Sequence, residues 1–117
     1  MQYITFDELK PLDLILLGRI AIDFNPLDYY KTLAESETFK KYVGGSPANI
    51  AVGLSRLGKK CGFFARVSDD RFGEFVTDYF KREGIDVSHV KTCENGESLG
   101  PVSYTHLRAH ETVLDLV

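Results

Sequence analysis

The order of the apolar segments constrains the fold of this chain most strongly. An apolar run at residues 12–17, interrupted only by Asp13, ends at Gly18 and predicts a buried strand. A second run at residues 62–67, rich in aromatic and β-branched side chains, predicts another strand. A helical pattern follows each run, so the order strand, helix, strand, helix predicts an α/β fold with parallel strands and right-handed crossovers.

Both predicted helices have recognisable ends. Ser46 is placed to cap the first helix, because Pro47 then stands where no N–H donor is needed, and Gly58 ends it. Asp70 is placed to cap the second helix, which ends at Gly84. The predicted apolar face of the first helix consists of Ile50, Leu54 and Leu57. The second helix has the clearest helical period, carried by Phe72, Phe75, Val76, Tyr79 and Phe80.

The segment between the first strand and the first helix is predicted to be mostly irregular. The Asn25-Pro26 pair and many charged side chains make residues 24–37 a long loop with at most one short strand. Residues 38–43 alternate weakly between polar and apolar side chains, which predicts a solvated strand.

Length, charge and cysteine content exclude several classes of protein. A chain of 117 residues makes one small domain, and 14 basic against 17 acidic residues give a net charge of −3, which argues against a nucleic-acid partner. Its apolar runs are far shorter than the roughly 20 residues of a membrane span, and residues 1–10 contain no secretory signal. Cys61 and Cys93 are too few for a disulfide framework or a zinc set. We therefore expect a cytoplasmic protein with no membrane partner.

The Gly-Gly-Ser-Pro-Ala-Asn motif at residues 44–49 carries the strongest functional signal. Its two glycines let a ligand approach the backbone, and the following helix start offers N–H groups and a positive dipole end. The amide of Asn49 can both donate to and accept from a hydroxyl group. These features suit a polyhydroxylated or anionic small molecule, although a plain tight turn before a capped helix has the same pattern.

An acid upstream of this motif is a second candidate. Asp23 follows the first strand, near the edge of a parallel sheet where ligands collect, and its carboxylate can accept two hydroxyl protons. A solvated loop acid is the alternative interpretation. Arg19 can either pair with Asp23 or bind a substrate anion, and we favour the structural ion pair.

Two other patterns do not meet the requirements of the sites that they suggest. Residues 53–60 match the phosphate-binding pattern G-x-x-x-x-G-K, but Lys60 stands where Ser or Thr is required, and the residues end a helix instead of beginning one. His106 and His110 are four residues apart, but Leu107 stands where a zinc protease has glutamate. We therefore assign no metal site.

The blocks described so far resemble the ribokinase-like (PfkB) carbohydrate kinases over residues 12–100. The resemblance rests on the Gly-Arg-x-x-x-Asp block that ends at Asp23, on the motif at residues 44–49 with its following Ile-Ala, on Leu57-Gly58, and on Val-Ser-Asp-Asp-Arg-Phe-Gly at residues 67–73. Within the family, residues 39–49 most resemble the branch that phosphorylates 5-dehydro-2-deoxygluconate in inositol catabolism. The 2-keto-3-deoxygluconate kinases and the fructokinases are near neighbours.

The resemblance implies an incomplete ribokinase-like fold, with a mostly parallel sheet, flanking helices and a small β lid. It implies that residues 24–43 and 97–105 form this lid over the sugar and that the lid can mediate a homodimer. The implied substrate-binding residues are Asp23, Gly44, Gly45 and Asn49, with Arg19 and Ser46 as further candidates.

The resemblance further implies an enzyme that uses ATP and Mg²⁺ when complete. The family's second motif, Gly-Ala-Gly-Asp, supplies its catalytic base, and this string is absent from the 117 residues. We therefore assign no catalytic residue here, and we expect this chain alone to be inactive and to bind no cofactor tightly. Residues 1–100 resemble the N-terminal part of a longer kinase, whereas residues 101–117 resemble translated adapter DNA and are expected to be non-native. The alternative is a non-catalytic small-molecule binding or dimerisation module.

Overall fold

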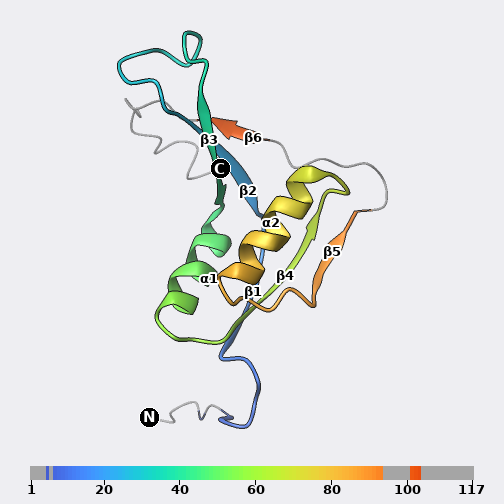
Figure 1. Cartoon of the computed structure of the whole chain (residues 1–117). Coiled ribbons are helices and arrows are strands. Elements are labelled where there is room, and N and C mark those ends of the chain that lie inside the picture. The colour runs from blue at the N-terminus through green and yellow to red at the C-terminus, as the bar shows by residue number, and fades with distance from the viewer. Residues whose placement is uncertain (1–4, 6, 94–100, 104–117) are drawn as a thin grey trace.

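Residue 5, residues 7–93 and the backbone of residues 101–103 are described by the computed structural model. Within these residues the chain forms two three-stranded sheets and two helices (Figure 1). The first sheet has the order β1 (Leu14–Leu17), β4 (Cys61–Val67), β5 (Val90–Thr92). The second has the order β3 (Phe39–Gly44), β2 (Ala21–Pro26), β6 (Pro101–Ser103). The helices are α1 (Ser46–Arg56) and α2 (Arg71–Arg82).

The first sheet is parallel throughout, which confirms the α/β prediction. β1 pairs with β4 from Leu14↔Cys61 to Leu17↔Phe64, and β4 pairs with β5 from Ala65↔Val90 to Val67↔Thr92. The main core lies between this sheet and the two helices, where the rings of Phe63 and Phe80 stack with centroids 5.0 Å apart. No helix in the described part of the chain is long and apolar enough to cross a membrane.

A strand does form within residues 12–17, but the prediction that this strand is buried is wrong. β1 begins at Leu14, and of its four residues only Leu16 is buried, whereas Ile15 is 54% and Leu17 73% exposed. Side chains alternate along a strand, so Ile15 and Leu17 lie on the face opposite Leu16. The described helices pack on the Leu16 face, and the opposite face stays open.

The start of α1 also differs from the prediction. Gly45, with φ of 96°, is the N-cap, no side chain caps this helix, and Ser46 is already helical. The buried face of α1 is made by the small residues Ala48 and Ala51, because the helix lies close to the sheet, whereas Ile50 is 49% exposed. The predicted cap at Ser46 is therefore wrong. Of the predicted apolar face, Leu54 packs against the core as expected, whereas Ile50 and Leu57 are exposed.

The remaining helix ends confirm the sequence predictions. Oδ1 of Asp70 accepts from the backbone N–H groups of Phe72 (2.9 Å) and Gly73 (3.0 Å), so Asp70 caps α2. Gly58 and Gly84 follow α1 and α2 with φ of 85° and 76°, the left-handed conformation that ends a helix. Of the predicted face of α2, Val76 and Phe80 are fully buried, and Phe72, Phe75 and Tyr79 pack against the core.

The C-terminal ends of the two helices are joined by polar contacts. Arg56 makes two hydrogen bonds to the carboxylate of Glu83, from Nε at 2.8 Å and from Nη2 at 2.6 Å. The hydroxyl of Ser55 donates to the carbonyl oxygen of Glu83 at 2.5 Å. These contacts link the ends of the two helices, which both pack on the core of the parallel sheet.

The second sheet extends beyond the helices, with the loop of residues 27–38 at its far end (Figure 1). β2 and β3 pair in antiparallel fashion from Ala21↔Gly44 to Pro26↔Phe39, and the backbone of β6 runs parallel to β2. β3 confirms the strand predicted at residues 38–43. The loop predicted at residues 24–37 starts later, because β2 continues to Pro26.

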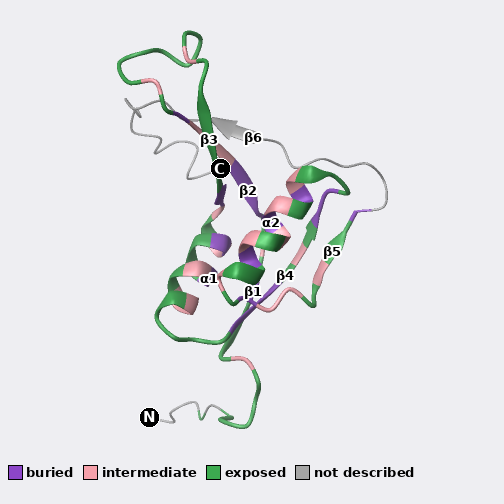
Figure 2. Ribbon diagram, viewed as in Figure 1, coloured by how far each residue is buried: buried purple, intermediate pink, exposed green. Residues whose placement is uncertain are grey.

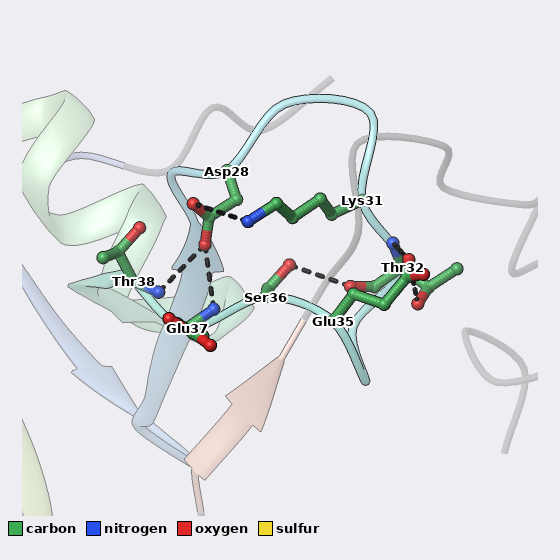
Figure 3. Close-up of polar contacts among 7 residues, drawn as sticks. All are labelled: Asp28, Lys31, Thr32, Glu35, Ser36, Glu37 and Thr38. Carbon is green, nitrogen blue, oxygen red and sulfur yellow. Dashed lines mark hydrogen bonds and ion pairs between the residues drawn. The ribbon is translucent and has the colours of Figure 1, made fainter.

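The loop of residues 27–38 is closed by side-chain contacts to its own backbone (Figure 3). Oδ2 of Asp28 accepts from the N–H groups of Glu37 (2.9 Å) and Thr38 (3.0 Å), and Lys31 lies 3.7 Å from Oδ1. Glu35 accepts from the backbone and hydroxyl of Thr32. Most of this loop and β3 is exposed, whereas buried segments gather where the helices meet the sheets (Figure 2).

Candidate ligand-binding site

The β2–β3 pairing brings Asp23 against the glycines of the motif at residues 44–49. Asp23 lies opposite Tyr42, and Gly44 is two residues further along β3. A Cβ atom added to Gly44 would lie 2.7 Å from Cγ and 2.9 Å from Oδ1 of Asp23. The carboxylate therefore packs directly on the backbone of Gly44, although 21 positions separate the two residues.

Gly45 is required by both its conformation and its surroundings. Its φ of 96° is unfavourable for residues with a side chain, and an added Cβ atom would lie 2.7 Å from the carbonyl oxygen of Arg19. The carbonyl oxygen of Gly45 accepts the N–H of Asn49 at 3.0 Å, which forms the first turn of α1. Gly45 thus joins the end of β3, the turn before β2 and the start of α1.

Gly18 belongs to the same junction, and the sequence interpretation missed it. A Cβ atom on Gly18 would lie 2.7 Å from Cγ of Pro47, and the φ of Gly18 is 153°. The end of β1 therefore packs tightly against the first turn of α1. The sequence did offer a signal, because Gly18 directly follows the predicted first strand. Only the fold shows that Pro47 is the neighbour of Gly18.

The start of α1 supplies donors to this junction. The first helical N–H groups have no partner within the helix, and the first turn contains no acidic residue to offset their positive end. Ser46 and Asn49 are exposed on this turn, and Arg19 is exposed on the turn between β1 and β2. The elements that meet at Gly44 and Gly45 thus carry a carboxylate at Asp23, an amide at Asn49, a hydroxyl at Ser46 and backbone donors, and groups of these kinds suit hydroxyl-rich ligands.

A separate open hollow of about 600 Å³ lies at the start of α2, away from Asp23. Two of its four acidic residues already act within the fold, because Asp70 caps α2 and Glu74 pairs with Arg71 at 2.6 Å. We therefore place the candidate site at Asp23.

One of the two patterns that the sequence analysis rejected lies within the described residues. Residues 53–60 span the end of α1, which confirms that they do not form a phosphate-binding loop. The described ranges hold no group of three or more His, Cys, Asp or Glu that could bind a metal ion. His106 and His110 lie outside the described residues, as do residues 104–117 of the tail that we expect to be non-native.

Comparison with known proteins identifies the family. The pfkB family carbohydrate kinase model matches residues 12–103, which is most of the chain. The chain belongs to the pfkB family of carbohydrate kinases. This finding confirms the resemblance drawn from the motifs and the ribokinase-like fold expected from it.

Individual relatives agree with the family match. A 5-dehydro-2-deoxygluconokinase of Clostridium perfringens is 66% identical over 100 residues, which are 86% of this chain and 30% of that protein. The structure of Halothermothrix orenii fructokinase matches with a TM-score of 0.71 and 35% identity over 80% of this chain and 34% of its own. A Pyrococcus horikoshii sugar kinase in complex with ATP matches with a TM-score of 0.74 and 31% identity over 83% of this chain and 31% of its own. The chain thus spans less than a third of its curated relative.

Proposed function

We propose that this chain is the sugar-binding part of an ATP-dependent carbohydrate kinase. The observation that carries the proposal is the position of the Asp23 carboxylate, which lies on the backbone of Gly44 beside the start of α1. A carboxylate there accepts hydroxyl protons, and the nearby backbone N–H groups donate to ligand oxygens. Membership of the pfkB family supports this assignment.

Each residue of the site has a distinct proposed role. Asp23 accepts protons from two sugar hydroxyls, and Asn49 binds a further hydroxyl through its amide. Gly44 and Gly45 let the sugar lie against the backbone; a Cβ atom at Gly44 would displace the Asp23 carboxylate, and one at Gly45 would collide with the backbone at Arg19. Arg19 and Ser46, both exposed at the same junction, are further candidates for binding an anionic group.

The proposed acceptor is 5-dehydro-2-deoxygluconate, which places the protein in inositol catabolism in the cytoplasm. The name of the Clostridium perfringens relative supports this choice, and the fructokinase neighbour makes fructose the comparison substrate. The proposed phosphoryl donor is ATP, which the ATP-bound Pyrococcus horikoshii kinase supports, and Mg²⁺ is proposed as its accompanying ion. Because Gly-Ala-Gly-Asp is absent from these 117 residues, we assign substrate binding to this chain and assign it no catalytic base.

Substitution of the carboxylate tests the proposed function. Calorimetric titration with 5-dehydro-2-deoxygluconate should show binding to the unmodified chain. Asp23→Ala should weaken it roughly tenfold or more, because hydrogen bonds to a charged group contribute about 1.5–3 kcal/mol each. Asp78→Ala, which removes an exposed acid from α2, is the matched control and should bind as the unmodified chain does. No binding of either this acid or fructose to the unmodified chain would contradict the proposal.

We also propose that the β2–β3 hairpin and its loop form a homodimer contact. The loop of residues 27–38 exposes apolar side chains, among them Leu27 and the fully exposed Tyr30. Sedimentation analysis should show a monomer–dimer equilibrium that Tyr30→Glu shifts toward monomer, because a charge there opposes burial of the loop. A dimer of unchanged affinity in Tyr30→Glu would exclude this contact.

A further inference from the structure

Asn25 has a buried amide oxygen without a hydrogen-bond partner in the described part of the chain. The residue lies near the end of β2 and pairs with Lys40 of β3, and its Oδ1 is the one buried side-chain oxygen or nitrogen atom left unsatisfied there. A buried acceptor without a donor costs about 1–3 kcal/mol. This cost is removed when a bound ligand supplies the missing donor.

The position of Asn25 on β2 indicates where that ligand lies. Residues two apart in a strand share a face, so Asn25 and Asp23 lie on the same face of β2, about 7 Å apart along the strand. The opposite face of the hairpin packs on α2, where Phe24 meets Phe72 edge-on at 6.0 Å and Nζ of Lys41 lies 4.3 Å from the Phe75 ring centroid. Asn25 therefore belongs to the ligand-site side of the hairpin.

We propose that Asn25 is a second hydroxyl-recognising residue of the Asp23 site. Its Oδ1 accepts the proton of a ligand hydroxyl while Asp23 holds other hydroxyls of the same molecule, a separation that an extended six-carbon chain spans. This inference rests on the proposed function, since it requires a hydroxyl-rich ligand at Asp23.

The charge beside Asn25 narrows the ligand class. Lys40 lies directly opposite Asn25 on the same face, with its ammonium group 5.3 Å from the centroid of the Tyr42 ring. A positive charge at this end of the site favours a sugar acid over a neutral sugar. The ligand class that fits this face is therefore a polyhydroxy acid.

A purely structural role for Asn25 makes the opposite predictions. If Asn25 only ended β2 before Pro26, its replacement would destabilise the fold and leave ligand affinity unchanged. If Asn25 binds ligand, Asn25→Leu removes an unpaired buried acceptor, so the free protein is at least as stable as before while its ligand affinity falls.

The test combines affinity with stability in the full 117-residue chain. Calorimetry and NMR titration use 5-dehydro-2-deoxygluconate as the probe and fructose as the neutral comparison, and thermal melts without ligand measure stability. We expect Asn25→Leu to weaken binding of the acid roughly tenfold or more without lowering the melting temperature. The side-chain amide resonance of Asn25 should shift on titration of the unmodified chain. Glu37→Gln, an exposed change in the adjoining loop, is the control and should alter neither quantity.

Failure of this inference is distinct from failure of the proposed function. If Asp23→Ala weakens binding but Asn25→Leu does not, the role of Asn25 is overturned and the proposed function stands. If fructose binds as tightly as the acid, the assignment to a polyhydroxy acid is overturned. If the unmodified chain binds neither compound, the proposed function and the role of Asn25 are both overturned.

Discussion

At the scale of single residues, the absence of a side chain at Gly44 shapes the candidate site. In Gly44→Ala the new methyl group would occupy the place of the Asp23 carboxylate, which can rotate away because it ends a flexible side chain. We therefore expect Gly44→Ala to weaken sugar-acid binding about as much as Asp23→Ala does, with little change in stability. Calorimetry combined with urea denaturation measures both effects. Unchanged affinity in Gly44→Ala would contradict the placement of Asp23.

Gly53 provides the matched glycine control and a prediction of its own. It lies inside α1, is exposed, and has no atom within 4 Å of an added Cβ atom. Gly53→Ala should stabilise the chain by about 0.5–1 kcal/mol, because glycine loses more backbone entropy than alanine in a helix. Urea denaturation should show a higher midpoint with an unchanged slope, and ligand affinity should stay the same.

At the scale of elements, the start of α2 depends on one carboxylate. Asp70 accepts two backbone N–H groups of the first turn and also the hydroxyl of Ser68 at 2.6 Å. Asp70→Ala should therefore cost about 1 kcal/mol of stability, within the usual range of 0.5–2 kcal/mol for loss of an N-cap. Asp69→Ala, which removes the exposed neighbouring acid, is the control, and its free energy of unfolding gives the baseline for the comparison. Equal stability of the two variants would rule out a capping contribution.

The loop between β2 and β3 has a predictable response to acid. The N–H groups of Thr38 and Glu37, with Lys31 nearby, hold the pKa of Asp28 at about 2, below its ordinary value of 3.8 (Figure 3). A lowered pKa means that this carboxylate stabilises the folded loop above about pH 4 and loses that effect as the pH falls through about 2. The amide resonance of Thr38 should therefore titrate with a midpoint near pH 2. Asp28→Asn should abolish this titration, and a midpoint near pH 4 would contradict the contact.

At the scale of the whole molecule, the parallel sheet has one covered and one open face. Ile15 and Leu17 of β1 share the open face with Phe64 of β4, and all three are more than half exposed. Such an apolar surface promotes association, so heated solutions should become turbid in a concentration-dependent way. Leu17→Glu should reduce turbidity at little cost in stability, because the side chain is already exposed. Aggregates formed in this way have no fixed size, whereas the dimer proposed for the hairpin contains two copies of the chain.

Much of the fold could be predicted from local patterns. β3, β4 and both helices lie near their predicted positions, because helical periodicity and the glycines at residues 58 and 84 act within a few neighbouring residues. The burial of β1 could not be predicted, because a run of apolar residues is the same whether other elements cover one face of the strand or both. The cap of α1 was misassigned to Ser46 because the turn at Gly45 depends on packing against the chain at Arg19.

For the candidate site, too, some features could be predicted from the sequence and others could not. The sequence alone determined the motif at residues 44–49, the upstream acid and the family, because each is a matter of residue type and order. Only the tertiary structure decided that the Asp23 carboxylate packs on Gly44, that Gly18 meets Pro47, and that Asn25 has an unpaired buried oxygen. The reason is physical: contact and burial arise between segments distant in the chain, and the pairing of β2 with β3 determines which of them meet.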